Sequence, residues 1–189
     1  GSSNVGRIIA ERAATNLKPV LLELGGKAPL LVLEDADLDA AVDAAAFGAF
    51  MNQGQICMST ERVIVVDAIA DEFLAKFKAK VDQLAVGDPA EGKTPLGAVV
   101  HQKSVDHVES LIADAVGKGA TRLCGGDANG VLMPANVVSE VTTDMRIYSE
   151  ESFGPVVGVI RAKDEEEAID IANDSEYGLS SAVFTRDIA

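Results

Sequence analysis

Apolar residues in this chain alternate between helical and strand-like spacing, and this alternation limits the possible folds more than any other feature of the sequence. The spacing predicts helices over 4–16, 37–54, 69–84, 101–118 and 164–173, and strands over 19–23, 30–33, 62–66, 132–138 and 156–160. Asp37 and Asp164 are predicted to cap two of these helices. Strands that alternate with helices form parallel sheets covered on both sides. We therefore expect an α/β fold with an open, largely parallel sheet and helices on both faces.

The charge and the apolar patterning exclude two classes of partner. The sequence has 16 Lys and Arg against 30 Asp and Glu, a net charge of −14, which is the wrong sign for binding phosphates along nucleic acid. No apolar stretch approaches the roughly 18 residues of a membrane helix. Cys57 and Cys124 show no paired spacing, so a disulfide framework or zinc ribbon is not expected and a reducing, cytoplasmic location fits.

Both ends of the sequence look truncated. The chain begins at Gly1 without Met and stops in a strand-like stretch, 181–187. Taken alone, 1–3 (GSS) could remain from an expression tag. No signal peptide is visible, and a targeting segment could lie outside the chain. We expect a piece of a longer protein.

The polar segment 51–60 (MNQGQICMST) follows a predicted helix and presents a single thiol, Cys57. A cysteine attacks as the thiolate, and a loop with free backbone N–H groups can lower the thiol pKa and stabilise an oxyanion formed beside it. Free cysteines are more often small buried residues, so spacing alone leaves both interpretations open. Cys124, at an apolar strand end, is the weaker candidate.

Two further motifs combine a carboxylate with glycine. The segment 23–27 (ELGGK) places Glu23 at the end of a predicted strand, where ligands gather in open α/β sheets, and a partly desolvated glutamate can act as a general base. Its two glycines suggest a close backbone approach or positive φ. In 150–155 (EESFGP), Glu151 and Phe153 flank a tight turn that could bind ligand hydroxyls. Solvated surface acids are the alternative for both motifs.

The remaining candidates are weaker. His101 and His107 lie on one predicted helix, about 240° apart around it, so they cannot share a metal, and no metal site is expected. The acidic run 165–167 fits a solvated helix start. The opening 1–6 (GSSNVG) could hold phosphate at a helix N-terminus, although two glycines alone are weak evidence.

Together, the motifs resemble the aldehyde dehydrogenase superfamily along essentially the whole chain. Segment 1–6 resembles its cofactor turn, 23–27 its general-base motif, 52–57 (NQGQIC) its nucleophile motif, and 151–155 its ribose-binding turn. Four such motifs in the family order are hard to ascribe to chance. The stretch 55–62 (QICMSTER) is most similar to members that oxidise aromatic aldehydes such as salicylaldehyde or vanillin.

The resemblance implies a two-step oxidation of a small-molecule aldehyde to a carboxylate. Cys57 would attack the aldehyde to give a thiohemiacetal, hydride would pass to NAD or NADP, and Glu23 would activate the water that hydrolyses the thioester. Gly1, Ser2 and Gly6 would form the pyrophosphate turn. The family's oxyanion is held by the nucleophile's own N–H and by an Asn from an earlier segment that this chain does not contain.

The same resemblance assigns the cofactor side of the site. Glu151 would bind the nicotinamide ribose, and Phe153 would lie beside the nicotinamide. The family often has a ribose-binding Lys where this chain has His107, which leaves that role open.

Length is the main departure from the family. The resemblance implies that 1–24 is the last helix and strand of a dinucleotide-binding domain, and that 25–189 is a catalytic domain incomplete at its C-terminus. The full-length parent is expected to be a homo-oligomer. The alternative is a non-catalytic fragment or interaction module that keeps the fold but lacks a usable cofactor site.

Overall fold

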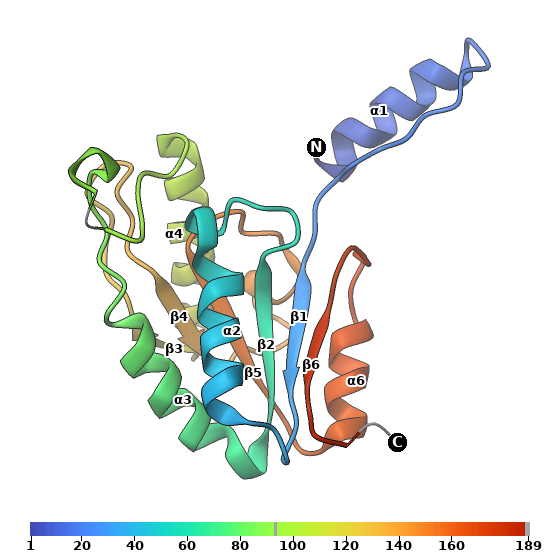
Figure 1. Cartoon of the computed structure of the whole chain (residues 1–189). Coiled ribbons are helices and arrows are strands. Elements are labelled where there is room, and N and C mark those ends of the chain that lie inside the picture. Colours follow the sequence, from blue (N-terminus) through green and yellow to red (C-terminus); the bar gives the residue numbers. More distant parts are fainter. Residues whose placement is uncertain (93, 188–189) are drawn as a thin grey trace.

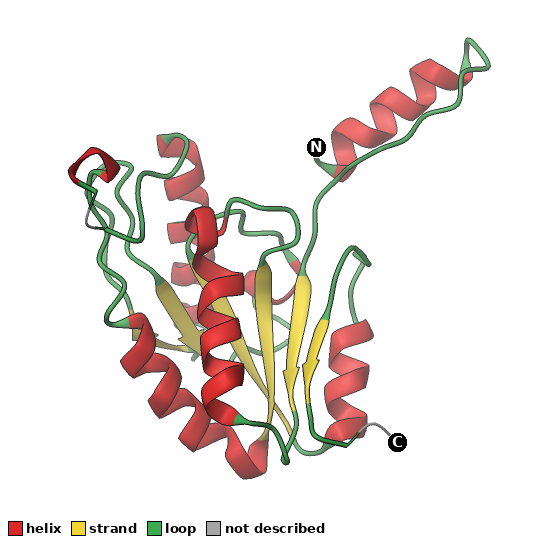
Figure 2. Cartoon of the chain, viewed as in Figure 1, coloured by secondary structure: helices red, strands yellow, loops and turns green. Residues whose placement is uncertain are grey.

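The computed structural model describes residues 1–92 and 94–187, which are built around one six-stranded sheet (Figure 1, Figure 2). The strand order is β3-β4-β5-β2-β1-β6, with parallel pairing throughout except for the antiparallel edge pair β3–β4. The strands are β1 (Ala28–Val32), β2 (Thr60–Val66), β3 (Thr121–Cys124), β4 (Asn136–Ser139), β5 (Val156–Ala162) and β6 (Ala182–Phe184). The predicted open, largely parallel sheet is confirmed.

Helices cover both faces of this sheet. These helices are α2 (Leu38–Phe50), α3 (Asp67–Val81), α4 (Gln102–Gly117), α5 (Arg146–Ser149) and α6 (Glu165–Asn173), and there are short 3₁₀ turns η1 (Met51–Gly54) and η2 (Pro89–Glu91). The first helix, α1 (Ser3–Ala14), lies away from the sheet (Figure 1). Figure 1 shows α2 and α3 in front of the sheet and α4 behind it. Within the described residues, no helix is both long and apolar enough to cross a membrane.

The strand β2 shows how the sheet is buried on both sides. Val63 and Val65 belong to the apolar cluster that contains α2 and α3, whereas Ile64 and Val66 belong to the cluster that contains α4, α5 and α6. Successive side chains of a strand point to opposite faces, so a continuous apolar run suits a strand covered on both faces.

The helix starts follow the predicted caps. The Asp37 side chain accepts a hydrogen bond from Ala40 N (3.2 Å), and the Asp164 side chain accepts one from Glu167 N (2.9 Å). Each cap satisfies a backbone N–H that has no partner inside its helix.

The strand predicted over 132–138 starts too early. The ladder begins only at Asn136, whereas Leu132 forms an isolated bridge with Asn129. Pro134 lies between these two pairings and has no N–H to donate to a ladder. The short strand β3 pairs beside β4 and adds an edge that the periodicity did not separate from its surroundings.

The structure has no strand over 19–23, so this prediction is wrong. Residues 15–27 carry no regular secondary structure except turns at 15–17, and they lead from α1 to the sheet as an extended segment. Figure 1 shows α1 and this segment projecting from the rest of the molecule. An extended apolar segment becomes a strand only when another strand pairs with it, and no described strand does so here. We call residues 1–24 the arm and residues 25–187 the body.

Candidate active site

Three motifs singled out from the sequence end directly before three neighbouring parallel strands. The segment 23–27 precedes β1, the loop 55–59 precedes β2, and 151–155 precedes β5. Because β5, β2 and β1 are adjacent and parallel, the segments before them meet at one edge of the sheet. That edge holds the amino ends of the strands. The expectation that Glu23 lies at the carboxyl end of a strand is therefore wrong. The three motifs nevertheless come together, at the amino ends of the strands.

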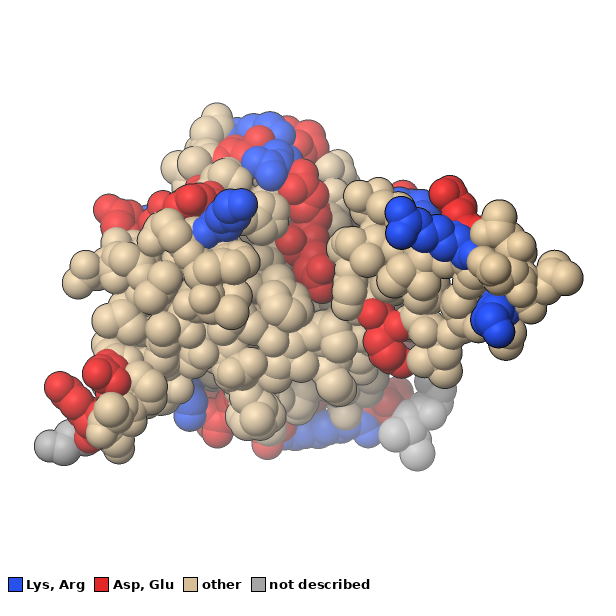
Figure 3. All heavy atoms as spheres, turned by 90° about the horizontal axis from the view of Figure 1, so that it is seen from above, with Lys and Arg blue, Asp and Glu red and all other residues tan. Residues whose placement is uncertain are grey.

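The three segments line one cleft with a volume of about 600 Å³. Its lining contains nearly all of the predicted site residues, namely Gly1, Ser2, Glu23, Cys57, Glu151 and Phe153, together with Leu24, Gln55 and Ile56. Gly6 is the exception, because it lies within α1 against the Leu24 side chain. Seen from above, this side of the molecule is mostly uncharged, with patches of acidic and basic residues that touch in places (Figure 3).

The loop that carries Cys57 begins with an unusual backbone. Asn52, Gln53 and Gly54 have φ values of 52°, 57° and 67°, so three successive residues adopt the left-handed region. For Asn52 and Gln53 this conformation is strained, and the surrounding contacts must hold it in place. The loop presents Cys57 half-buried at the cleft.

Side-chain hydrogen bonds hold the start of this loop. Asn52 Nδ2 donates to Gln55 O (3.3 Å), and Gln55 Nε2 donates back to Asn52 O (3.2 Å). Gln55 Oε1 also accepts from Val100 N (2.8 Å), which ties the loop to the segment before α4. Within the described residues, no hydrogen bond uses the Cys57 N–H, so it is available to a bound oxyanion.

Glycines allow the three motifs to approach one another. A Cβ on Gly26 would lie 2.1 Å from Cys57 O, and one on Gly25 would lie 2.5 Å from Glu151 Oε2. A Cβ on Gly54 would lie 2.2 Å from Gly154 O. The structure thus selects close approach, and not positive φ, as the reason for the glycine pair at 25–26.

Glu151 is held with one carboxylate oxygen engaged. Its Oε1 accepts from Gly26 N (2.9 Å), and no described residue donates to Oε2. Burial raises the pKa of Glu151, and the hydrogen bond from Gly26 N opposes that shift. Phe153 follows at φ 46° with a partly exposed ring. A half-buried carboxylate with one free oxygen beside an accessible aromatic ring can accept ligand hydroxyls and contact a planar group.

Glu23 lies on the arm side of the cleft. Its backbone carbonyl accepts from the Gly1 nitrogen (2.9 Å), which holds the start of the arm next to the end of its extended segment. The residue itself is exposed, in contrast to the partly buried Glu151. Its carboxylate is therefore open to water at the rim of the cleft.

Comparison with known proteins identifies the family. Residues 1–189 match the family described as the aldehyde dehydrogenase family. The chain belongs to the aldehyde dehydrogenase family. It is 59% identical over 189 residues to salicylaldehyde dehydrogenase of Pseudomonas putida and 55% identical over 187 residues to vanillin dehydrogenase of Pseudomonas fluorescens. These alignments cover 100% and 99% of this chain but 39% of each relative, so the chain spans about two fifths of their length.

Solved structures of aldehyde dehydrogenases show the same fold. A salicylaldehyde dehydrogenase from Pseudomonas putida G7 complexed with salicylaldehyde matches with a TM-score of 0.95 at 57% identity, over 100% of this chain and 39% of that one. An NADP-dependent glyceraldehyde-3-phosphate dehydrogenase from Bacillus halodurans C-125 complexed with NADP gives 0.94 at 43% identity, over 99% and 39%. An NAD-dependent benzaldehyde dehydrogenase from Corynebacterium glutamicum gives 0.94 at 47%, over 100% and 41%.

A buried ion pair next to the segments that line the cleft was not assigned a role from the sequence. Lys27 Nζ lies 2.6 Å from Glu61 Oε2, and the two side chains are only 1% and 4% exposed. Burial lowers the pKa of Lys27, and the adjacent Glu61 carboxylate opposes this shift and favours the charged ammonium. The available signal was the position of both charges at the start of apolar strands, where a solvated side chain would be unusual.

Arg62, the residue after Glu61, is a second buried cation with different partners. Its guanidinium donates to Lys27 O (3.2 Å) and to the carbonyl oxygens of Ile171 and Ala172 (both 2.9 Å) at the end of α6. It also lies 5.7 Å from the centre of the Tyr148 ring. The last carbonyls of a helix lack partners within the helix, so Arg62 fixes α6 to the sheet.

The two histidines act separately. His101 lies before α4, where its Nδ1 accepts from Ser104 N (3.1 Å) and caps the helix. His107 Nε2 lies 3.0 Å from Glu151 O, and because a carbonyl only accepts, Nε2 carries the proton. Among residues 1–92 and 94–187, no group of three or more His, Cys, Asp or Glu side chains could hold a metal ion.

Proposed function

We propose that this chain is the thiol-bearing part of an enzyme that oxidises an aromatic aldehyde to its carboxylate with NAD or NADP. The observation that supports this most directly is the convergence of Cys57, Glu23, Glu151 and Phe153 on one cleft from separate segments of the chain. The names of the similar proteins, which include salicylaldehyde, vanillin and benzaldehyde dehydrogenases, support the substrate class.

Cys57 is the proposed nucleophile. Attack of its sulfur on the aldehyde carbon forms a C–S bond and an oxyanion, and the unused Cys57 N–H can donate to that oxygen. Loss of hydride from the same carbon leaves a thioester on Cys57. A bound nicotinamide supplies the hydride acceptor in this chemistry.

Glu23 is the proposed base for the second step. Its exposed position at the rim of the cleft gives it access to water. Removal of a proton from that water produces the nucleophile that attacks the thioester, releases the carboxylate product and returns the Cys57 thiolate. The base and the thiol come from the arm and the body, respectively.

Other residues that line the cleft fit a nicotinamide riboside. Glu151 Oε2 has no donor among the described residues and can accept ribose hydroxyls, while the Phe153 ring is accessible for contact with a planar ring. Gly1 and Ser2 line the same cleft at the start of α1, where backbone N–H groups favour an anion such as a pyrophosphate. Similar proteins named as NAD-dependent and as NADP complexes support either cofactor.

The arm fits the proposal that 1–24 belongs to a dinucleotide-binding domain and 25–189 to the catalytic domain. Apolar side chains of the arm are exposed, among them Ile8 and Leu21, as expected for a segment packed against residues outside this chain. A homo-oligomer and a cytoplasmic location of the whole protein remain predictions.

The decisive experiment measures aldehyde oxidation by the whole protein that contains this chain. Salicylaldehyde and vanillin are supplied with NAD or NADP, and reduced cofactor is followed by absorbance. Cys57→Ala should lower kcat by about 10⁴-fold or more, because loss of a catalytic nucleophile removes the covalent route. Cys124→Ala is the matched control, since Cys124 is buried in β3 and outside the cleft.

Two results would overturn the proposal. Activity that survives Cys57→Ala would exclude it as nucleophile. Absence of oxidation by the unsubstituted whole protein, with either cofactor, would favour the alternative of an interaction module that keeps the fold.

A further inference from the structure

The buried pair Lys27–Glu61 calls for an explanation beyond stability. Its two charges lie 2.6 Å apart with side-chain exposures of 1% and 4%. Removing both ions from water costs free energy that their attraction often fails to recover, and apolar residues of similar size are commonly as good or better for stability. A buried ion pair at this position is therefore better explained by a role in positioning neighbouring groups.

The contacts of Glu61 indicate which groups the pair positions. Its carboxylate accepts from Ser152 N at both oxygens (3.0 and 2.8 Å) and from Phe153 N (3.1 Å). These two N–H groups belong to the turn between Glu151 and β5, which has no ladder or helix to hold it. Glu61 thus fixes the backbone that carries both proposed cofactor-binding residues.

Lys27 is linked to the same turn through Glu61 and through its chain neighbour Gly26. It follows Gly26, whose N–H donates to Glu151 Oε1 (2.9 Å). The Lys27 ammonium in turn bonds the Glu61 oxygen that also accepts from Ser152 N. The pair therefore connects the segment that orients the Glu151 carboxylate to the carboxylate that fixes the Glu151–Phe153 backbone.

We propose that Lys27 and Glu61 are positioning residues that set the Glu151 carboxylate and the Phe153 ring for binding of the dinucleotide. This inference rests on the proposed function, because it assigns these residues to the cofactor side of the cleft and not to the thiol. Arg62, the other buried cation, has a different role from Lys27. Arg62 bonds carbonyls at the end of α6 and secures the fold there, whereas the Lys27 ammonium donates only to Glu61 among the described residues.

The test uses the whole protein with Lys27→Met, Glu61→Gln and the double variant. Glu61→Gln keeps the shape but can accept at only one of its two end atoms, so it cannot hold both N–H groups and Lys27 together. The double variant removes both buried charges at once and avoids leaving one unpaired.

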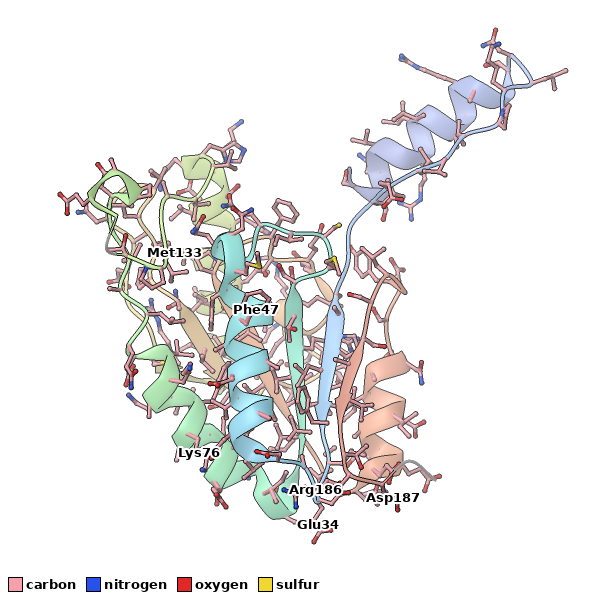
Figure 4. All side chains as sticks on the ribbon, in the orientation of Figure 1. Glu34, Phe47, Lys76, Met133, Arg186 and Asp187 are labelled. Atoms are coloured by element: carbon pink, nitrogen blue, oxygen red, sulfur yellow. The ribbon has the colours of Figure 1, made fainter. Side chains whose placement is uncertain are left out.

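The matched control is the pair Lys76–Asp39. It has the same 2.6 Å separation but is exposed, with side chains 38% and 82% accessible. Figure 4 shows Lys76 on α3, toward the end of the molecule away from the arm. The control is Lys76→Met with Asp39→Asn.

We expect the affinity for NAD or NADP, by titration calorimetry, and the cofactor KM to weaken by roughly 10–100-fold, the range seen when a group that orients a binding residue is removed. The Cys57 alkylation rate, the aldehyde KM and kcat at saturating cofactor should change by less than about threefold. The double variant should melt near the unsubstituted protein yet retain weak cofactor binding, which a purely structural role would not produce. The control should match the unsubstituted protein in all measurements.

Three outcomes would overturn the inference. Unchanged cofactor affinity in the variants would remove the pair's role while leaving the proposed function intact. A parallel fall in cofactor affinity, thiol reactivity and melting temperature, restored in the double variant, would make the pair structural. Absence of NAD and NADP binding in the unsubstituted protein would refute the proposed function and this inference with it.

Discussion

The arm and the body contribute to the same cleft but are held by different means. In the body, Cys57 and Glu151 lie just before neighbouring strands, joined through glycine contacts and through a buried carboxylate. In the arm, Glu23 ends a segment without strand pairing, and none of the closely packed pairs of helices and strands in the described part includes α1. Cys57, the proposed nucleophile, is therefore positioned by packing within this chain, whereas Glu23, the proposed base, depends on a segment that the body hardly restrains.

The largest effect that tests this difference concerns Glu23. In the whole protein, Glu23→Gln should preserve a first burst of reduced cofactor and slow steady turnover by about 10²–10⁴-fold, the usual range for loss of a general base. Rapid-mixing absorbance separates the two phases. Glu34→Gln is the control, because Glu34 is exposed and lies at the opposite end of the molecule (Figure 4). Loss of the burst with cofactor binding intact would instead assign Glu23 to activation of Cys57.

The two thiols of the body give the next largest contrast. Burial raises the pKa of Cys124 from 9.0 to about 11, so its thiolate fraction near neutral pH is about 100-fold below that of an ordinary thiol. Iodoacetamide at neutral pH should therefore mark Cys57 first, as read by peptide mass. Labelling of Cys124 should rise roughly tenfold for each pH unit until pH nears its pKa of about 11.

Equal labelling of both thiols at neutral pH would contradict this contrast. It would mean that β3, at the edge of the sheet, opens readily enough to expose Cys124. Cys57 in the cleft and Cys124 in the core would then not differ in reactivity.

Sequence periodicity was sufficient for most of the body because its strands are buried on both faces. The continuous apolar run 63–66 is bounded by Arg62 before it and Asp67 after it, and these charged residues mark the ends of the run. The arm shows the limit of this reasoning. The run 19–23 has the composition of a strand, but pairing depends on a partner that periodicity cannot supply.

The grouping of the site was predictable from motifs, while its inner contacts were not. The order of 23–27, 52–57 and 151–155 already associates the segments with one family. The contact between Lys27 and Glu61 joins residues 34 positions apart, and that from Glu61 to Ser152 spans 91. Such pairings follow from the strand order β5-β2-β1, which a single sequence does not fix.

A smaller effect is expected where the 23–27 segment touches the thiol loop. Gly26→Ala would place a Cβ 2.1 Å from Cys57 O, a backbone atom that can move only with its loop. Overpacking of this kind typically costs about 1–3 kcal/mol of unfolding free energy. Gly117→Ala is the control, because nothing lies within 4 Å of its Cβ at the end of α4. Urea unfolding of both variants measures the difference, and equal stabilities would show that the loop yields easily.

The smallest effect is expected from removal of residues 1–17. The α1 helix exposes Val5, Ile8 and Ile9, and its first residues bond mainly to the arm itself, as between the Gly1 nitrogen and Glu23 O. Its loss should leave the unfolding free energy of the body within about 0.5 kcal/mol, as for other changes at a surface.

Urea unfolding of the full and shortened chains tests this expectation, with circular dichroism as a second measure. A 12-residue helix without tertiary support is marginal in water, so the shortened chain should lose little helical signal. A loss of several kcal/mol would show that the arm and the body unfold as one unit, and the contrast between them would not hold. An unchanged value would mean that the body folds independently of α1, so that stability of the body does not depend on where the arm holds Glu23.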